Sequence, residues 1–168
     1  KKPGIDQLQA SLGNTDPRVR AVALNALVSD NKLTPALIVG LLKDKEPGIR
    51  EQAVAILPAN QVDFAQVARE DQSPAVQAAA LRRISNKQSL PLLCERLHSN
   101  DPFMQQAARE GLRQTLTNAE LAELFSQNDD SAVRLAAIFL LKESNTPADD
   151  SLLKQALQDQ NPDVRFVA

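Results

Sequence analysis

The stretch Asp16-Pro17-Arg18-Val19-Arg20, with Ala23 and Leu27 after it, decides the fold of this 168-residue chain because it recurs along the whole sequence. Five further copies begin at Glu46, Ser73, Asp101, Asp130 and Asn161. The second residues of the six copies stand at 17, 47, 74, 102, 131 and 162. A period of roughly 30 residues is typical of stacked helical repeats. The sequence therefore predicts an all-α fold made of antiparallel helix pairs.

The first residue of each copy is suited to capping a helix. Asp, Ser and Asn side chains accept hydrogen bonds from the free N–H groups at a helix start, and only Glu46 departs from these types. Proline follows in every copy except the one at Asp130, where Ser131 stands. Proline fits the first helical position, where its missing N–H would have no partner. Each copy is expected to begin a helix.

Three columns of apolar residues follow at helical spacing, and positions 0, 4 and 8 share one face. The first column is Val19, Ile49, Val76, Met104, Val133 and Val164. Alanine always stands four residues later, at Ala23, Ala53, Ala80, Ala108, Ala137 and Ala168. Leucine or isoleucine stands eight residues later in the first five copies. The constant alanine predicts that a neighbouring helix approaches closely, so that a larger side chain would overpack the contact.

A second set of amphipathic segments lies between the copies. They are expected at residues 5–13, 34–43, 62–70, 89–98, 118–127 and 148–158. No segment alternates apolar and polar residues with a period of two, so no sheet is predicted.

Composition narrows the possible functions. Lys plus Arg is 19 and Asp plus Glu is 21, a net charge of −2, and the chain has no Trp or Tyr. A slightly acidic, aromatic-poor chain is a poor candidate for nucleic-acid binding. One Cys and one His are too few for a structural zinc site. No apolar run approaches the ~20 residues needed to span a bilayer. The sequence predicts a soluble protein and does not indicate its compartment.

Cys94 and His98 are the one pair that resembles a catalytic arrangement, because residues four apart share a helix face. A thiolate beside an imidazole is a nucleophile and base in principle. However, Cys94 lies on the apolar face with Leu90 and Leu97, which favours a buried thiol beside a histidine at the turn. Glycine-rich phosphate loops are absent. No catalytic, cofactor-binding or metal-binding residue is predicted.

The unit of helix, short turn, Asp-Pro-x-Val-Arg and Ala- and Leu-rich helix resembles a HEAT repeat of the short bacterial type, also called PBS-lyase-like. The resemblance covers essentially the whole chain as about 5.5 repeats. It implies a right-handed α-solenoid, or α/α superhelix, forming a single domain over residues 1–168. The second helix of each pair would line the concave face.

The resemblance also implies a ladder of charged side chains between successive repeats. Its expected members are Asp16, Arg20, Arg50, Asp101, Asp130, Arg134 and Arg165, with Asp44, Asp71 and Asp159 as further possible partners. Gln77 and Gln105 occupy the Arg position in the third and fourth repeats, so the ladder is expected to be interrupted there.

Two functions remain open. The first is a non-catalytic protein–protein interaction or scaffold module. The second is a lyase-like or chaperone-type subunit that handles a chromophore or other prosthetic group. The single His does not match the repeated His-Glu pairs with which HEAT-like deoxyhypusine hydroxylases hold iron. The scarcity of aromatics argues against the HEAT-like DNA glycosylases. We expect no enzymatic activity, no cofactor and no membrane insertion, and the oligomeric state stays open.

One surface is a candidate binding site for another protein or a neighbouring domain of the same chain. Residues two and six positions after the first apolar column point away from the predicted core, and they become large and apolar near the C-terminal end. The apolar residues are Leu135, Phe139 and Phe166, with Arg82, Arg109 and Arg113 as a charged rim. Alternatively, curvature buries these residues, or sequence beyond Ala168 covers them. The last repeat is incomplete, which predicts at least one more helix after Ala168.

Overall fold

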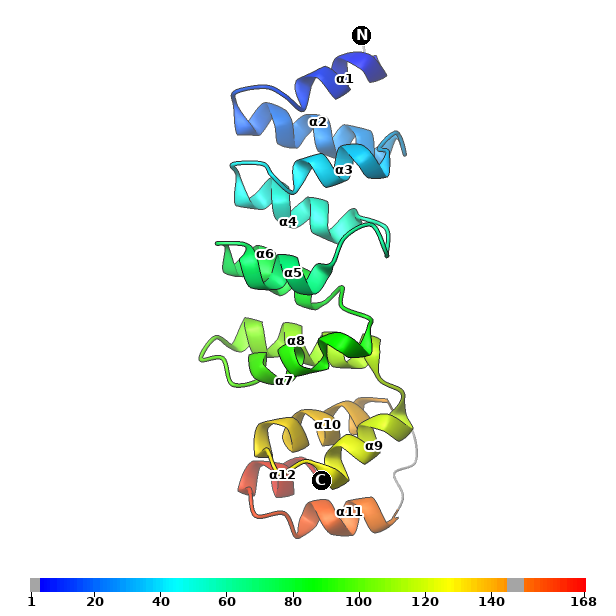
Figure 1. Ribbon diagram of the computed structural model, residues 1–168, viewed down its shortest axis with the longest axis vertical. Helices are drawn as coiled ribbons and strands as arrows, with labels where there is room; N and C mark the ends of the chain where they lie inside the picture. The colour runs from blue at the N-terminus through cyan, green and yellow to red at the C-terminus, as the bar shows by residue number, and fades with distance from the viewer. Residues whose placement is uncertain (1–3, 145–149) are drawn as a thin grey trace. The chain divides into compact units, whose positions relative to one another are not determined.

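Proline or serine begins the second helix of each pair, where the sequence predicts it. Figure 1 shows the order of the helices along the chain. The computed structural model describes residues 4–144 and 150–168, and every regular element within them is helical. The predicted all-α class is therefore confirmed for this part of the chain. No helix among these residues has the length and apolar character required to cross a membrane.

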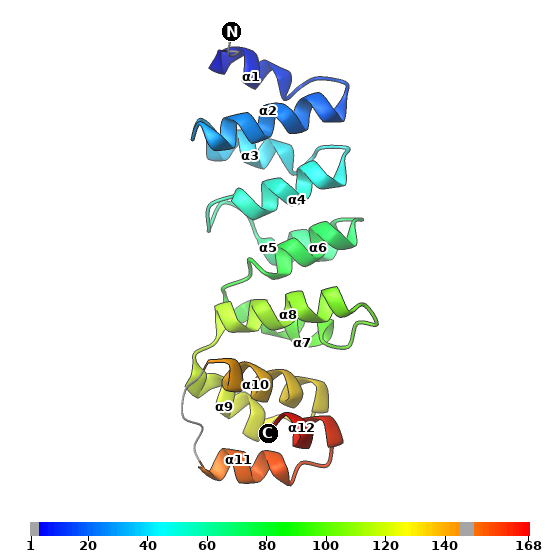
Figure 2. The same cartoon turned by 180° about the vertical axis from the view of Figure 1, so that it is seen from behind.

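Contacts divide the chain into two compact units, Lys1–Ala80 and Leu81–Ala168. The helices of the first unit are α1 (Ile5–Ser11), α2 (Pro17–Ser29), α3 (Pro35–Leu41), α4 (Pro47–Ile56), α5 (Phe64–Glu70) and α6 (Pro74–Leu81), whose last residue falls in the second unit. Helix α1 packs on α2 and α3 packs on α4. Helix α5 precedes α6 along the chain in the same first-and-second order (Figures 1 and 2). That the two units form one domain stays a prediction.

The second unit repeats the same pairing. Its helices are the 3-10 turn η1 (Lys87–Ser89), α7 (Leu90–Arg96), α8 (Pro102–Thr115), α9 (Asn118–Gln127), α10 (Ser131–Glu143), α11 (Asp150–Leu157) and α12 (Pro162–Val167). The packed pairs are α7 with α8, α9 with α10 and α11 with α12. Helix α10 also contacts both α8 and α12, so the second helices of three successive pairs are neighbours (Figure 2).

Several first helices are shorter than predicted, and the cause is local. After α1, the N–H groups of Leu12, Gly13 and Asn14 bond to carbonyls three residues back instead of four. The same happens after α3 and α7. This 3-10 geometry tightens the last turn and brings the chain round into the next cap. Residues 148 and 149 of the predicted 148–158 helix lie outside the described residues.

The caps form as the sequence indicates. Side chains of Asp16, Asp101, Asp130 and Asn161 each accept a hydrogen bond from the backbone N–H two residues later, at 2.8 to 2.9 Å. Glu46 stands at the cap position of α4 without a side-chain cap bond, as its longer side chain predicts.

The predicted columns form the core. In the first column only Val19, in the first repeat, is exposed, and the other five members are buried. The alanines from Ala23 to Ala137 are at most 2% exposed. The structure adds a column that the sequence analysis omitted, five residues after the first. Its apolar members, all buried, are Leu24, Val54, Leu81 and Ile138.

Gly111 marks a close approach inside the second unit. A Cβ at this position would lie 2.6 Å from the carbonyl oxygen of Leu81 and 2.5 Å from a methyl group of Leu93. The glycine therefore lets α8 lie directly against the backbone of Leu81 and the side chain of Leu93 on α7.

Candidate functional site

Three arginines each hold the aspartate of the following turn by two hydrogen bonds. Arg50 donates from Nε and Nη2 to the two carboxylate oxygens of Asp71, at 2.7 and 2.8 Å. Arg20 holds Asp44 in the same way at 2.8 and 2.6 Å. Arg134 holds Asp159 at 2.7 and 2.8 Å. All six side chains are at most 15% exposed, so these are well-ordered bidentate pairs.

The same residues also bond to the backbone of their own turn. Arg50 Nη1 donates to the carbonyl oxygens of Asp44 and Lys45, six and five residues earlier. Arg20 and Arg134 make the equivalent pair of bonds. Gln77 and Gln105, which replace Arg, each donate one bond to the carbonyl six residues back, at 2.6 and 2.7 Å. Glutamine thus keeps one of the two bonds that arginine makes to the backbone of its own turn. It has no positive charge with which to pair an aspartate of the next turn.

Each paired aspartate also organises its own turn. Oδ1 of Asp44, Asp71 and Asp159 accepts a 2.8 Å bond from the backbone N–H two residues later. The hydrogen bond from the partner arginine lowers the pKa of each carboxyl below its ordinary value of 3.8, against a smaller opposing effect of burial. These groups are therefore ionised at neutral pH and serve structure, not proton transfer.

The expected membership of the ladder is wrong for three residues. Asp16, Asp101 and Asp130 cap helices and do not bond to the ladder arginines. The true partners stand two residues before the cap, because that position faces the preceding turn. Asp16 pairs with its near neighbour Arg18 on an exposed surface. Arg165 bonds to backbone carbonyls of its own turn and to no carboxylate within residues 4–144 and 150–168.

Cys94 and His98 do not form a nucleophile–base pair. His98 Nε2 lies 2.6 Å from Oδ2 of Asp130, which links the turn before α8 to the cap of α10. Burial, followed by the charge of Asp130, raises the pKa of the half-buried Cys94 thiol. A thiol whose pKa is raised is a weak nucleophile.

The structure brings part of the predicted binding patch together on α8 and α10. The guanidinium carbon of Arg109 lies 5.1 Å from the centre of the Phe139 ring, a cation–π contact. Arg109 Nη2 also donates to Gln106 Oε1 at 2.6 Å. Phe139 is partly buried, so the expectation that it points freely outward needs correction. The long stem of an arginine can cover an aromatic face while its charged end stays accessible.

The rest of the patch extends along the same second helices. Arg113 forms ion pairs with Glu143 of α10 and, at 3.2 Å, with Glu110. Lys142 Nζ donates to the carbonyl oxygen of Val167 at 2.7 Å and so ties α10 to α12. Phe166 of α12 is 90% exposed. We call the set Gln106, Arg109, Arg113, Phe139, Glu143 and Phe166 the second-helix patch.

Two predicted members are not joined to the second-helix patch. Leu135 is partly buried on α10. Arg82 is partly buried just after α6, and among the described residues no hydrogen bond or ion pair connects it to Arg109 or Arg113.

Sequence analysis missed what is unusual about Arg109. This residue occupies the column whose other members, Leu24, Val54, Leu81 and Ile138, are apolar and buried. Its Nε atom is buried with no hydrogen-bond partner. Alignment of the repeats at the position five residues after the first column would have revealed the substitution.

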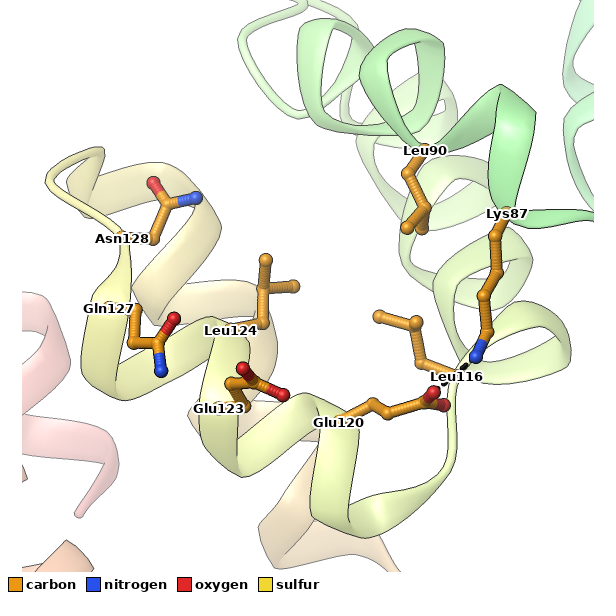
Figure 3. Close-up of a pocket in the computed structure, with 8 residues that line it drawn as sticks. All are labelled: Lys87, Leu90, Leu116, Glu120, Glu123, Leu124, Gln127 and Asn128. Carbon is orange, nitrogen blue, oxygen red and sulfur yellow. Dashed lines mark hydrogen bonds and ion pairs between the residues drawn. The ribbon is translucent and has the colours of Figure 1, made fainter.

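A separate pocket of about 390 Å³ lies between the start of α7 and helix α9 (Figure 3). Leu90, Leu116 and Leu124 supply apolar surface, and Glu120 forms an ion pair with Lys87. The bond from Lys87, helped by bonds from Thr117, lowers the pKa of Glu120 to about 2. A carboxylate with this pKa stays ionised and is a poor general acid at neutral pH.

Among the residues described, no three His, Cys, Asp or Glu side chains are grouped closely enough to hold a metal ion. What the second-helix patch offers is an aromatic ring, an oriented guanidinium and a rim of both charges.

Comparison with known proteins supports the fold class. The X-ray structure of YibA from E. coli is similar over 99% of this chain and 68% of the YibA chain, with a TM-score of 0.51 and 18% identical residues. A likeness at this level of identity concerns the fold alone. No protein-family model and no curated protein matches the chain.

Proposed function

We propose that this chain is a non-catalytic protein-binding module built as a right-handed α-solenoid of HEAT-like repeats. The helix pairs within each unit follow the predicted period, and the arginine–aspartate pairs tie successive turns together. In such an architecture each repeat packs mainly on its neighbours, which leaves an extended face of second helices free for a partner.

The observation that carries the binding role is the placement of Arg109 over Phe139. A charged side chain in an otherwise apolar column does not serve the core. Arginine and aromatic residues are enriched at protein interfaces, and an arginine already oriented on a ring loses less conformational freedom on binding. The exposed Phe166 ring adds an apolar anchor on α12.

Charge suggests the chemistry of the partner. Glu110 and Glu143 already neutralise Arg113, whereas Arg109 bonds only to the uncharged Gln106 and contacts the Phe139 ring among the described residues. The Arg109 guanidinium is therefore the cation of this group that has no carboxylate partner among the described residues. A protein segment with a carboxylate beside an apolar side chain fits this surface.

The test compares partner capture by the wild-type chain and by point variants under native conditions. Arg109→Gln and Phe166→Asp should each reduce capture of the same specific protein by tenfold or more, by the usual order of magnitude of interface anchors. Phe103→Asp is the matched control, because Phe103 is 76% exposed on α8 and lies outside the second-helix patch.

Circular dichroism of each variant separates loss of binding from loss of helical structure. Phe166→Asp and Phe103→Asp should leave helicity unchanged, since both rings are largely exposed. Phe139→Asp should also abolish capture. If Phe139→Asp alone lost helicity while Arg109→Gln and Phe166→Asp still captured the partner, the ring would be core and the patch would not be the binding site.

A further inference from the structure

One step of the ladder inside the second unit lacks the arginine–aspartate pair. Gln105 of α8 stands where other repeats carry the arginine, and Asn128 stands where the next turn would carry the aspartate. Gln105 donates to the carbonyl oxygen of Ser99 in its own turn. Asn128 Oδ1 accepts from the backbone N–H of Asp130, as the ladder aspartates do within their own turns. Neither side chain therefore supplies a charge to the contact between the two turns.

A histidine–aspartate pair joins the same two turns. His98 lies between α7 and α8, and Asp130 caps α10. Nε2 of His98 lies 2.6 Å from Oδ2 of Asp130, 32 residues later. The pair thus bridges the helix pairs α7–α8 and α9–α10, across which Arg109 of α8 also meets the Phe139 ring of α10. His98 is the single histidine of the chain, and it stands at a step where the arginine of the ladder is replaced.

The geometry allows the imidazole to take up a proton without losing its bond. Burial acts to raise the pKa of Asp130, but the bonds from His98 and from the Ala132 N–H lower it below its ordinary value of 3.8. An ionised carboxylate only accepts hydrogen bonds, so Nε2 of His98 carries the hydrogen. Nδ1 makes no hydrogen bond within residues 4–144 and 150–168, and the side chain is 55% exposed. A proton from solvent therefore enters at Nδ1 and leaves the Nε2–H bond in place.

Asp130 is the one charged side chain that bonds to His98 in the described part of the chain. Other titratable or charged groups lie within about two helical turns of the contact along the two chain segments. They are Cys94, Glu95, Arg96 and Asp101 on the α7–α8 side, and Glu123, Asp129 and Arg134 on the α9–α10 side. Arg134 is already paired with Asp159 by two hydrogen bonds. The contact between the two turns therefore depends on the charge state of the His98 ring.

We propose that the His98–Asp130 pair is a proton-dependent link between the helix pairs α7–α8 and α9–α10, in place of the arginine–aspartate pair that this step lacks. When the ring is protonated, its bond to Asp130 becomes an ion pair like those of the ladder arginines. Imidazole changes its charge between about pH 5 and about pH 8, whereas a guanidinium stays charged throughout. The link is therefore present on the acidic side of this range and weakens as the pH rises through it. This inference does not rest on the proposed function.

A double-mutant cycle, measured by urea unfolding of the full chain, tests the link. His98→Gln removes the titrating ring. Asp130→Asn removes the charge and keeps the cap, since Asn161 caps α12 with the same type of bond. The cycle expresses the coupling of the two side chains as a ratio of unfolding equilibrium constants. It should be about threefold at about pH 5, as for an exposed ion pair, and below about 1.5-fold at about pH 8.

Asp63→Asn combined with His98→Gln is the matched control. Asp63 caps α5 with a 2.9 Å bond from the Ala65 N–H, as Asp130 caps α10 from the Ala132 N–H, but it has no bond to the histidine. This second cycle should show no coupling at either pH. The proposal would be overturned by a His98–Asp130 coupling that is equal at the two pH values, larger at the higher one, or absent at both.

Discussion

Arg50 donates two hydrogen bonds to the carboxylate of Asp71, 21 residues later in the chain, and a further one to the carbonyl of Asp44 in its own turn. Asp44 in turn accepts the equivalent pair of bonds from Arg20. The first unit therefore contains a continuous chain of bonds that joins three successive turns. The arginines add directional bonds between helix pairs that are otherwise joined by apolar packing and by a hydrogen bond from Gln52 Nε2 to Asn25 Oδ1.

Removal of one member of the Arg50–Asp71 pair should cost more than removal of both. Arg50→Gln leaves a mostly buried carboxylate without its cation, which we expect to lower the free energy of unfolding by about 2 kcal/mol. The double variant Arg50→Gln/Asp71→Asn reproduces the native Gln105 and Asn128 combination and should regain part of that loss. Urea unfolding at neutral pH measures both, and strictly additive effects would contradict the coupling.

A fall in pH should lower the free energy of unfolding through the same arginine–aspartate pairs. The pKa of Asp71 is lowered in the folded protein by its bond from Arg50, below the ordinary value of 3.8. The stabilisation is therefore fully present above the ordinary value and is lost as the pH falls through the lower folded value. In a urea-unfolding series at decreasing pH, Asp71→Asn should flatten this acid limb. An identical slope in the variant would show that Asp71 does not contribute.

Gly111→Ala should destabilise the second unit despite the better helix propensity of alanine. The new Cβ would lie 2.6 Å from the Leu81 carbonyl oxygen, a backbone atom that cannot move without the end of α6. Overpacking of this kind costs about 1–3 kcal/mol. Gly40→Ala in α3 is the control, because nothing lies within 4 Å of its Cβ, and it should stabilise by up to about 1 kcal/mol. Thermal melts that rank the two variants in the opposite order would contradict this packing.

Ala80→Leu should test the constant alanine column. Ala80 is fully buried near the end of α6, and three extra carbon atoms there should cost about 1–3 kcal/mol. Ala75→Leu places the same side chain on the exposed side of α6 and should leave the melting temperature nearly unchanged. Equal melting temperatures for the two variants would mean that Ala80 does not limit helix approach.

The sequence by itself determined the local structure of this protein. The cap residues, the prolines after them and the apolar columns lie within about three helical turns of each other. Their spacing alone predicts where each second helix begins and which face it buries. The types of the ladder residues were also visible, including the glutamines at 77 and 105.

Only the tertiary structure decided which groups meet between helices. The arginine partners are Asp44, Asp71 and Asp159 and not the capping aspartates. Which aspartate an arginine reaches depends on how far one turn is displaced from the next, and spacing along a helix does not specify that displacement. The tertiary structure placed Arg109 over Phe139, 30 residues apart, by the packing of α8 on α10. It also showed that Arg165 donates to the carbonyl oxygens of Asp159 and Gln160 in its own turn. Such contacts depend on how each helix pair is displaced and rotated relative to the next. A periodic sequence shows that the helix pairs recur, but it does not specify that displacement.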